Sequence, residues 1–454
     1  MEDPGGSPSP ATQHWPARQW PALVAMGVGL VLCVAGMHIV RLDYGPDEPD
    51  HMQYIHILAR EHRLPTPADT HSVQHPPLYF LLMVPPYLLG GSEVAPFSLQ
   101  AGPQRLAEMT PGEKRSRYLC RYTQVLLAVL SLWLIGAVAR ELLPGRRKAH
   151  TAVLAGLAAW PLFVYVGSVV NNDMLALLWS AVAALCALRW LRAERWGDLR
   201  LGAALGVVLG LGLWMKLTTV YCLPVVILLV WLQQGSWGRR LRFAVACVAA
   251  TLAVGCWWYV RSFLAYGEAF PNFAGGMGEE AHVRALVLYD PLGQGLRFVG
   301  EAITRIARAS MLPEFLWGLG GGLGGLTSLS VVRGLVLVTA AVYLIYAASR
   351  GRMPPARVSG RIAWPAALAL ALACAMVIQY AVTRDLRGLT SGGRYVLAAS
   401  VWAAMLLLGA GERVAALLPS RATRTSVLAT VLCLSAIGAA AFVAVLVRWY
   451  GAIG

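Results

Sequence analysis

Charged residues are scarce in this chain. They make up 13% of its 454 residues, whereas hydrophobic residues make up 57%, and the mean hydropathy is +0.58. An ordinary soluble domain carries about 25% charged residues. The scarcity of charge therefore excludes an ordinary soluble domain and indicates a polytopic membrane protein.

Other features are missing as well. The formal charge is +15, but the arginines are spread among helix-flanking loops rather than gathered on one polar face, which argues against nucleic acid binding. The eight cysteines lack metal-ligand spacing, and most lie in apolar runs, so we predict neither disulfides nor a zinc site. No DxD motif is present. Topology and anionic lipid account better for the basic charge.

Apolar runs long enough to cross about 30 Å of hydrocarbon recur along the chain. They predict an all-α fold, a transmembrane bundle of about eleven helices. The expected spans are 22–40, 118–140, 149–170, 173–191, 199–214, 217–232, 241–261, 331–348, 362–382, 394–410 and 425–447.

Basic residues in the short loops predict the orientation. They are Arg140, Arg146, Arg147 and Lys148, then Arg189, Arg192, Arg195 and Arg200, then Arg239, Arg240 and Arg242, and later Arg350, Arg352, Arg357 and Arg361. By the positive-inside rule these loops are cytoplasmic. The stretches 41–117, 171–173, 262–330 and 384–394 then face the opposite side.

The remaining segments follow from this plan. Residues 1–21 are rich in Pro, Gly and Ser and predict a disordered tail, and 22–454 is expected to form one transmembrane domain whose first helix is retained. The outer loops at 41–117 and 262–330 are too short and hydrophobic for a soluble catalytic domain. Within the first of them, 49–63 predicts an amphipathic helix on the membrane surface, with Met52, Ile55, Leu58 and Ala59 on its apolar face. The proline-interrupted run 76–89 predicts an interfacial or re-entrant helix.

An acidic cluster follows the first span directly. In PDEPDHMQY at 46–54, Asp47, Glu48 and Asp50 are expected at the mouth of a membrane helix. Carboxylates at such a place are costly and usually functional. The cluster therefore predicts chemistry at a membrane surface.

Several segments together carry a family resemblance. The acidic pair after the first helix, a surface helix and HPPLYF at 75–80 resemble the GT-C superfamily of membrane glycosyltransferases, notably its protein O-mannosyltransferase and lipid A aminoarabinose transferase branches. VNNDMLAL at 170–177, MKLTTVYCLP at 215–224, WWYVRSFLAYGEAF at 257–270 and GGRYVLAA at 392–399 extend the resemblance over most of the chain.

The resemblance implies a function. It implies transfer of a sugar from a polyprenyl-phosphate donor to an acceptor on the non-cytoplasmic side of the cell membrane, and it leaves the acceptor open among protein, lipid and polysaccharide. Inverting transfer needs one carboxylate to take a proton and cations to stabilise the departing phosphate. A lipid or polysaccharide transporter without transferase activity is the alternative, but no internal repeat of the kind transporters show is seen.

The resemblance also suggests residue roles in the first loop. Asp47 matches the family's first-loop acid and is our candidate for the base, and Glu48 is the second candidate. Glu48 has an alternative role as a cap for the following helix, which Pro49 helps to start. His51 follows with a spacing closest to other bacterial branches, and a wet helix face is its bland alternative. His75 stands where the aminoarabinose transferases have a lysine, so a contact with the donor phosphate is one reading.

The later segments supply the remaining candidates. Asn172 and Asp173 belong to a polar corner that is a turn, an acceptor site, or the second half of a divalent cation site with Asp47. We expect no metal or other cofactor, because monophosphate donors do not demand one. Lys216 is either a substrate ligand or a residue snorkelling to headgroups. Arg261, Arg394 and the neighbouring Tyr395 are candidates for the phosphate, since a guanidinium binds two oxygens at once, with headgroup anchoring of the arginines as the alternative.

Overall fold

The structure is a computed structural model, and it describes residues 20–45, 47–93, 109–142, 147–192, 198–231 and 236–267. Every regular element in these ranges is a helix, which confirms the all-α class. The predicted spans at 331–348, 362–382, 394–410 and 425–447 lie outside the described residues, as do Arg394, Tyr395, and most of the tail 1–21 and of the loop 262–330.

The helices follow one another with few long connections. In chain order they are α1 (Trp20–Ile39), α2 (Glu48–His56), the π-helix η1 (Ile57–Glu61), the 3₁₀ helix η2 (His71–Gln74), α3 (Leu78–Gly90), α5 (Pro111–Leu142), α6 (Arg147–Ala158), α7 (Pro161–Ser168), α8 (Asp173–Arg192), α9 (Leu199–Leu213), the 3₁₀ helix η3 (Leu217–Tyr221), α10 (Cys222–Trp231), α11 (Trp237–Gly255) and α12 (Trp257–Tyr266).

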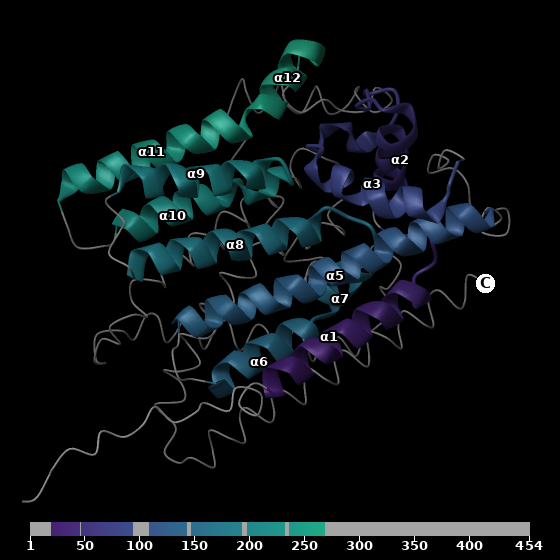
Figure 1. Ribbon diagram of the computed structural model, residues 1–454, viewed down its shortest axis with the longest axis horizontal. Helices are drawn as coiled ribbons and strands as arrows, with labels where there is room; N and C mark the ends of the chain where they lie inside the picture. The colour runs from purple at the N-terminus through teal and green to yellow at the C-terminus, as the bar shows by residue number, and fades with distance from the viewer. Residues whose placement is uncertain are drawn as a thin grey trace, which may run out of the picture.

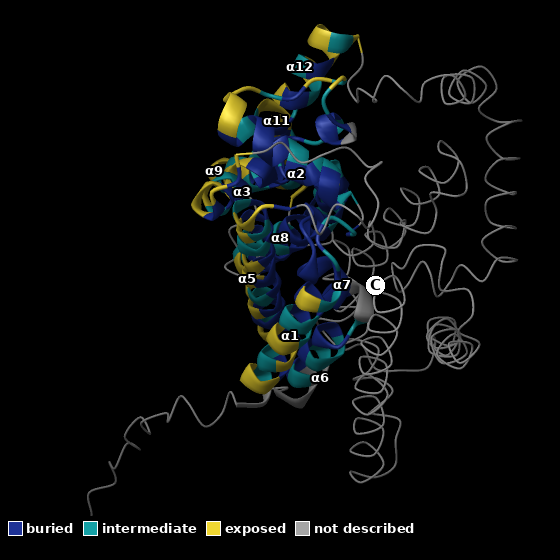
Figure 2. Cartoon of the chain, turned by 90° about the vertical axis from the view of Figure 1, so that its right-hand side faces the viewer, coloured by how far each residue is buried: buried dark blue, intermediate teal, exposed yellow. Residues whose placement is uncertain are grey.

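Three of these helices are long and apolar enough to cross a bilayer. The spans are Ala22–Ile39 in α1, Pro111–Glu141 in α5 and Asp173–Trp190 in α8, and α11 with α12 forms a fourth span if the bent pair is taken as one. Large apolar side chains such as Leu23, Val31 and Leu126 are exposed on the outer faces of this bundle. Figure 2 shows exposed positions along the outer faces of the helices and buried positions toward the interior. The chain is a multi-pass membrane protein.

Two predicted continuous spans are broken. The span expected at 149–170 is two helices, α6 and α7, because Pro161 has no N–H for the helical ladder and starts a new helix after Trp160. The span expected at 241–261 bends by 45° between α11 and α12. The span expected at 217–232 begins as the 3₁₀ helix η3 before α10. The regular helix geometry therefore changes after Ala158, after Gly255 and after Tyr221.

Small residues allow two helices to pack very closely. Gly202, Gly206 and Gly210 recur every fourth residue on α9, and this row faces α11. A Cβ at Gly202 would stand 2.8 Å from the carbonyl oxygen of Phe243, so the backbones approach more closely than any larger residue permits. Rows of small residues are a common means of helix association in membranes. The result is the side-by-side placement of α9 and α11 in Figure 1.

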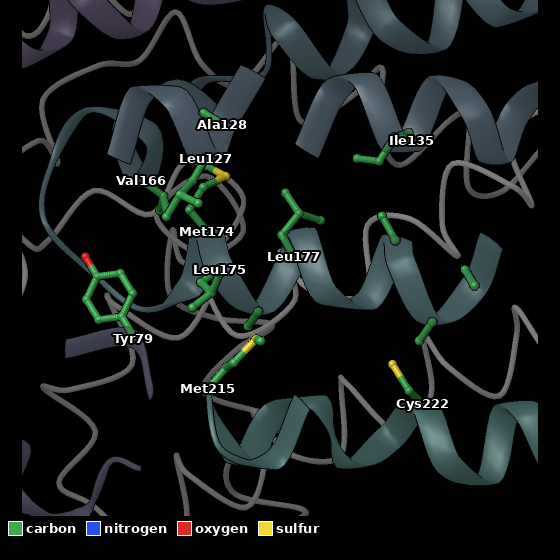
Figure 3. Packing of buried hydrophobic residues seen from close by; sticks show 14 of the residues in the cluster. Tyr79, Leu127, Ala128, Ile135, Val166, Met174, Leu175, Leu177, Met215 and Cys222 are labelled. Atoms are coloured by element: carbon green, nitrogen blue, oxygen red, sulfur yellow. The ribbon is translucent and has the colours of Figure 1, made fainter. Parts of the chain in front are cut away.

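The apolar core joins the long helices to the first loop. Figure 3 shows Leu127 of α5, Met174 and Leu175 of α8, and Met215 packed together, with Tyr79 of α3 at the N-terminal end of α8. All of these side chains are buried. The core therefore fixes the first loop against the start of α8.

The first loop contains helices where the sequence predicts them, but their exposure differs. Residues 49–63 form α2 and η1, and 76–89 falls within α3. The expected polar, solvent-exposed face of α2 is wrong, because His51 and His56 are only 1% and 5% exposed. The helix α2 packs on α3 and η2, and His51 contacts the carbonyl oxygen of Val170.

The connections fall into two groups in space. The first loop, the corner between α7 and α8, the α9–η3 connection and α12 gather at one end of the bundle in Figure 1. At the other end, Arg189 Nε of α8 donates a 2.9 Å hydrogen bond to Glu141 of α5, next to the basic loops. The outer and inner groups of loops predicted from the arginines are thus at opposite ends.

Candidate active site

Asp47 lies at the start of α2. It is the N-cap residue, half-buried, and its φ of 58° is in the left-handed region, yet its side chain makes no capping hydrogen bond. A left-handed conformation costs a residue other than glycine about 1–2 kcal/mol and recurs at functional sites. The carboxylate is thus held at the end of the bundle by its neighbours rather than by a capping role.

Glu48 is the best-held carboxylate of the loop. Its two oxygens accept four hydrogen bonds: from Arg121 Nε at 2.8 Å and Nη2 at 2.6 Å, from the Val170 amide at 3.0 Å and from the Gly45 amide at 3.2 Å. The residue is 1% exposed. A carboxylate has about four acceptor positions, so Glu48 is fully occupied. This geometry argues against Glu48 as the base, and its bonds go to Gly45 and Val170 rather than to its own helix as a cap.

The electrostatic surroundings of Glu48 also favour a paired, ionised carboxylate rather than a base. Burial acts to raise the pKa of Glu48, but the charge and hydrogen bonds of Arg121 and the two amides outweigh it and lower the pKa below its ordinary value. Glu48 is therefore ionised and paired at neutral pH.

Arg121 was not among the sequence candidates. Besides Glu48 it binds the carbonyl oxygens of Met37 at 2.8 Å, Val40 at 2.5 Å and Arg41 at 2.7 Å, and it is fully buried. It thereby satisfies the last carbonyls of α1 and fastens them to the loop. The signal was present, because Arg121 lies inside the predicted span 118–140 and a charge within a membrane helix needs a partner.

A second buried arginine extends this connection by one turn of α5. Arg117 Nε donates to both carboxylate oxygens of Asp43 at 2.8 and 2.9 Å, and Arg117 is 1% exposed. Asp43 also has a left-handed backbone, with φ of 64°. Arg117 and Arg121 are four residues apart and so share one face of α5. The whole segment between α1 and α2 is therefore anchored to α5.

The peptide of Val170 links the loop to the start of α8. Its amide donates to Glu48, and its carbonyl oxygen lies 3.1 Å from Nδ1 of His51. The ring of His51 packs 5.8 Å from that of His75 and 5.3 Å from that of Phe80, centroid to centroid. His51 and His75 are thus brought together, and the wet-face alternative for His51 is wrong.

His75 is joined to the second half of the bundle. Its carbonyl oxygen accepts a 3.3 Å hydrogen bond from the hydroxyl of Tyr54, and the amide of Leu78 donates to the Trp214 carbonyl at 3.3 Å. Since Trp214 lies two residues before Lys216, the proline-rich turn at 76–77 lies beside the α9–η3 connection.

The polar corner between α7 and α8 contains one turn residue and one exception. Asn171 is satisfied by the Val166 carbonyl at 3.1 Å, and its side-chain oxygen accepts from the Asp173 amide at 2.9 Å, as expected of a turn. Asn172 is also fully buried, but its side-chain nitrogen and oxygen have no hydrogen-bond partner in the described part of the chain. Buried polar atoms of this kind call for a ligand or a water.

Asp173 and Lys216 form a buried ion pair. Lys216 Nζ lies 2.5 Å from Asp173 Oδ1, and the two side chains are 5% and 3% exposed. Lys216 does not snorkel to the surface, and Asp173 has a cation other than a metal beside it. In the ranges that the structure describes, no group of three or more His, Cys, Asp or Glu residues is arranged to hold a metal ion.

Arg261 lies on α12 near the first loop. Its guanidinium is 5.0 Å from the ring centroid of Trp258 and 5.9 Å from that of Tyr266. Burial raises the pKa of Tyr54, and the positive charge of Arg261 acts in the opposite direction. The neighbouring Trp257 packs on Trp214, whose carbonyl oxygen binds the Leu78 amide, so α12 lies beside the first loop. Arg261 therefore joins His51, His75, Asp173 and Lys216 at one end of the bundle.

One known protein family matches part of the sequence. Residues 114–259 match the family described as dolichyl-phosphate-mannose-protein mannosyltransferase. No curated protein sequence matches the chain.

Solved structures show a similar fold. The oligosaccharyltransferase of Archaeoglobus fulgidus, in its complex with Zn and sulfate, superposes with a TM-score of 0.52 at 14% identity, covering 95% of this chain and 52% of its own. Its apo form gives a TM-score of 0.52 at 14% identity and covers 96% and 56%. ArnT from Cupriavidus metallidurans bound to undecaprenyl phosphate gives 0.39 at 15% identity, covering 88% and 79%.

The chain spans about half the length of the oligosaccharyltransferase chains that it resembles. The long shared coverage of this chain is therefore a likeness of its membrane helices to one part of a larger protein. Together with the family match over 114–259, it confirms the predicted GT-C-like fold of membrane helices.

Proposed function

We propose that the chain is an integral-membrane glycosyltransferase that moves a sugar from a polyprenyl-phosphate donor to an acceptor, with inversion at the anomeric carbon. The observation that carries this proposal is the family match over 114–259. That segment contributes Arg121 and Val170, which bind Glu48 of the first loop, and also the ion pair of Asp173 with Lys216. The match and the site thus concern the same part of the molecule.

Asp47 is the proposed base. It takes the proton of the acceptor hydroxyl while the acceptor oxygen bonds to the anomeric carbon, and the bond from that carbon to the phosphate oxygen breaks. The electron pair leaves with the polyprenyl phosphate. Of the two adjacent acids, Glu48 is committed to Arg121, whereas Asp47 is half-buried in a strained turn, which supports its assignment. General base catalysis of this kind contributes about 10²–10⁴-fold in rate.

The charged residues divide into two groups in the proposal. Arg261, with Arg394 and Tyr395 from the part of the chain not described, binds the phosphate, and His75 lies beside it. Lys216 is neutralised by Asp173 at 2.5 Å, so this pair with His51 and Asn172 faces the neutral part of the substrates. No step requires a metal ion.

The proposed orientation has the site on the non-cytoplasmic side. Reporter fusions after Arg147, Arg195, Arg240 and Arg357 should report the cytoplasm, and fusions within 90–115 and 265–310 the opposite side, because the short basic loops stay inside. A cytoplasmic signal from 90–115 would overturn the orientation of the site.

Reconstitution tests the function. The purified chain in liposomes is supplied with a panel of polyprenyl-monophosphate sugars carrying a labelled sugar, and acceptor extracts are added on one face. We expect label to move to an acceptor with inverted anomeric configuration and free polyprenyl phosphate to appear in equal amount. Movement of intact donor between leaflets without transfer would instead support the transporter alternative.

A further inference from the structure

Helix α12 carries three buried polar groups on one face. Trp258, Arg261 and Ser262 occupy positions i, i+3 and i+4, which lie on the same side of a helix. Trp258 and Ser262 are fully buried. Arg261 is half-buried and lies with its guanidinium 5.0 Å from the ring of Trp258. The three side chains therefore meet in one place.

Each of these groups has a polar atom without a protein partner. They are the indole Nε1 of Trp258, Nη1 of Arg261 and the hydroxyl of Ser262, all of them buried and without a hydrogen bond to any described residue. A buried donor without an acceptor costs about 1–3 kcal/mol, and native structures contain few of them. Three such donors within about one turn of one helix face indicate that a ligand supplies the acceptors.

The chemistry of the three groups defines that ligand. Indole N–H can only donate, a guanidinium only donates and is always charged, and a hydroxyl can donate. Among the described residues no carboxylate pairs with Arg261. Its guanidinium instead makes cation–π contacts with the rings of Trp258 and Tyr266. Several convergent donors around one unpaired cation suit a compact anion with multiple acceptor oxygens. A phosphate monoester has these properties, whereas a neutral hydroxyl offers too few acceptors.

The position of this face of α12 indicates that the ligand also has an apolar part. Trp257 of α12 packs against Trp214, whose carbonyl oxygen accepts a hydrogen bond from the amide of Leu78, so α12 borders the first loop. On the other side of α12, Val260, Phe263 and Leu264 are 53%, 58% and 78% exposed in a membrane protein. An anion held here has lipid-facing apolar surface within one helix diameter, as an isoprenyl chain requires.

We propose that Trp258 and Ser262, with Arg261, form the headgroup site for an isoprenyl monophosphate. In this site the indole N–H and the serine hydroxyl donate hydrogen bonds to the phosphate, although neither residue is charged. This inference rests on the proposed function for its choice of a lipid phosphate. It goes further in assigning two neutral residues to the site and in predicting that removal of a single N–H weakens binding.

The experiment uses two neighbouring tryptophans. Trp258→Phe removes the N–H and keeps an aromatic ring under Arg261. Trp257→Phe is the matched control, since Trp257 is 36% exposed and phenylalanine keeps an aromatic ring against both Trp214 and Trp258. Binding of a short isoprenyl monophosphate, of the isoprenyl alcohol of the same length and of inorganic phosphate is measured on the full chain in nanodiscs by native mass spectrometry and calorimetry. Ser262→Ala is the second variant.

We expect Trp258→Phe to weaken monophosphate binding about tenfold or more, as for a lost hydrogen bond to a charged group. Ser262→Ala should weaken it in the same direction, while Trp257→Phe and all alcohol affinities stay at the wild-type level. Equal monophosphate affinity for Trp258→Phe and wild type overturns the proposal, as does an equal loss for the alcohol. Binding of inorganic phosphate without the isoprenyl monophosphate overturns the lipid assignment.

The same measurements separate this site from the proposed reaction. Binding that depends on Trp258 in a protein that transfers no sugar supports the site and counts against the transferase. Sugar transfer with an unchanged donor KM in Trp258→Phe supports the transferase and counts against the site.

Discussion

Two regions at the same end of the bundle bury polar side chains in opposite ways. Between α1, α2 and α5, the side chains of Arg121 and Glu48 together make seven hydrogen bonds, either to each other or to backbone groups, and both residues are fully buried. Around α8, η3 and α12, Asn172, Thr218 and Trp258 are also buried, yet side-chain polar atoms of each have no partner among the described residues. The Arg121–Glu48 pair of the first region is complete without a ligand, whereas these three residues of the second region are not. The difference separates the scaffold of the site from the surfaces that bind substrate.

The largest expected effect comes from breaking the complete region. Arg121→Ala or Glu48→Ala should lower the free energy of unfolding by about 3–5 kcal/mol, because each leaves a buried charge unpaired. Unfolding titrations in mixed micelles measure this. The control is Arg189→Ala at the other end, where the side chain is 59% exposed and the pair with Glu141 is worth at most about 1 kcal/mol.

A double substitution sharpens that result. Arg121→Met with Glu48→Leu removes both charges, so it should be less destabilising than either alanine variant alone. Additive losses in the double variant would show that the two residues do not act as a pair.

The pH dependence of the complete region follows from Glu48. Its pKa in the folded protein is lowered from the ordinary 4.5, so its ionised form stabilises the fold fully above that pH. The contribution is lost as the pH falls below 4.5 through the folded pKa. We expect the stability difference between wild type and Glu48→Gln to shrink over that acidic range. A difference that stays constant or grows with acidity would contradict the ionised assignment.

Two adjacent threonines of η3 provide the smallest comparison between a buried hydroxyl with a protein partner and one without. The Thr219 hydroxyl donates to the Lys216 carbonyl at 2.9 Å, whereas that of Thr218 is buried and has no partner among the described residues. Thr219→Val should cost about 0.5–1.5 kcal/mol of stability, and Thr218→Val should cost nothing or stabilise the unliganded protein. Thermal unfolding of the two variants decides this. A similar loss in both would mean that Thr218 is not kept for a ligand.

Sequence reasoning recovered those parts of the fold that local pattern controls. The spans at 22–40 and 173–191 agree with α1 and α8 to within two residues at each end, because long apolar runs are the strongest local signal. The bend between α11 and α12 has no proline to announce it and depends on packing that the sequence does not display.

The site shows the same division. Asp47, His51, His75, Asp173 and Lys216 were named from motifs, and the fold gathers them at one end. The pairing of Glu48 was not predicted because its partner Arg121 stands 73 positions later in the chain. The ion pair of Lys216 was not predicted either, and snorkelling remained an alternative for it, because its partner Asp173 lies on another helix. Pairings over such separations are set by the fold, so local patterns do not reveal them.

The central claim is that Asp47, rather than its fully paired neighbour, removes the acceptor proton. Single-turnover sugar transfer with saturating donor measures this for wild type, Asp47→Asn and a matched control, Glu61→Gln, whose carboxylate is 40% exposed in the same loop and pairs with Arg63. We predict that Asp47→Asn retains donor binding and stability but loses about 10²–10⁴-fold in the transfer rate, while Glu61→Gln keeps the wild-type rate. Transfer by Asp47→Asn at the wild-type rate would contradict the account.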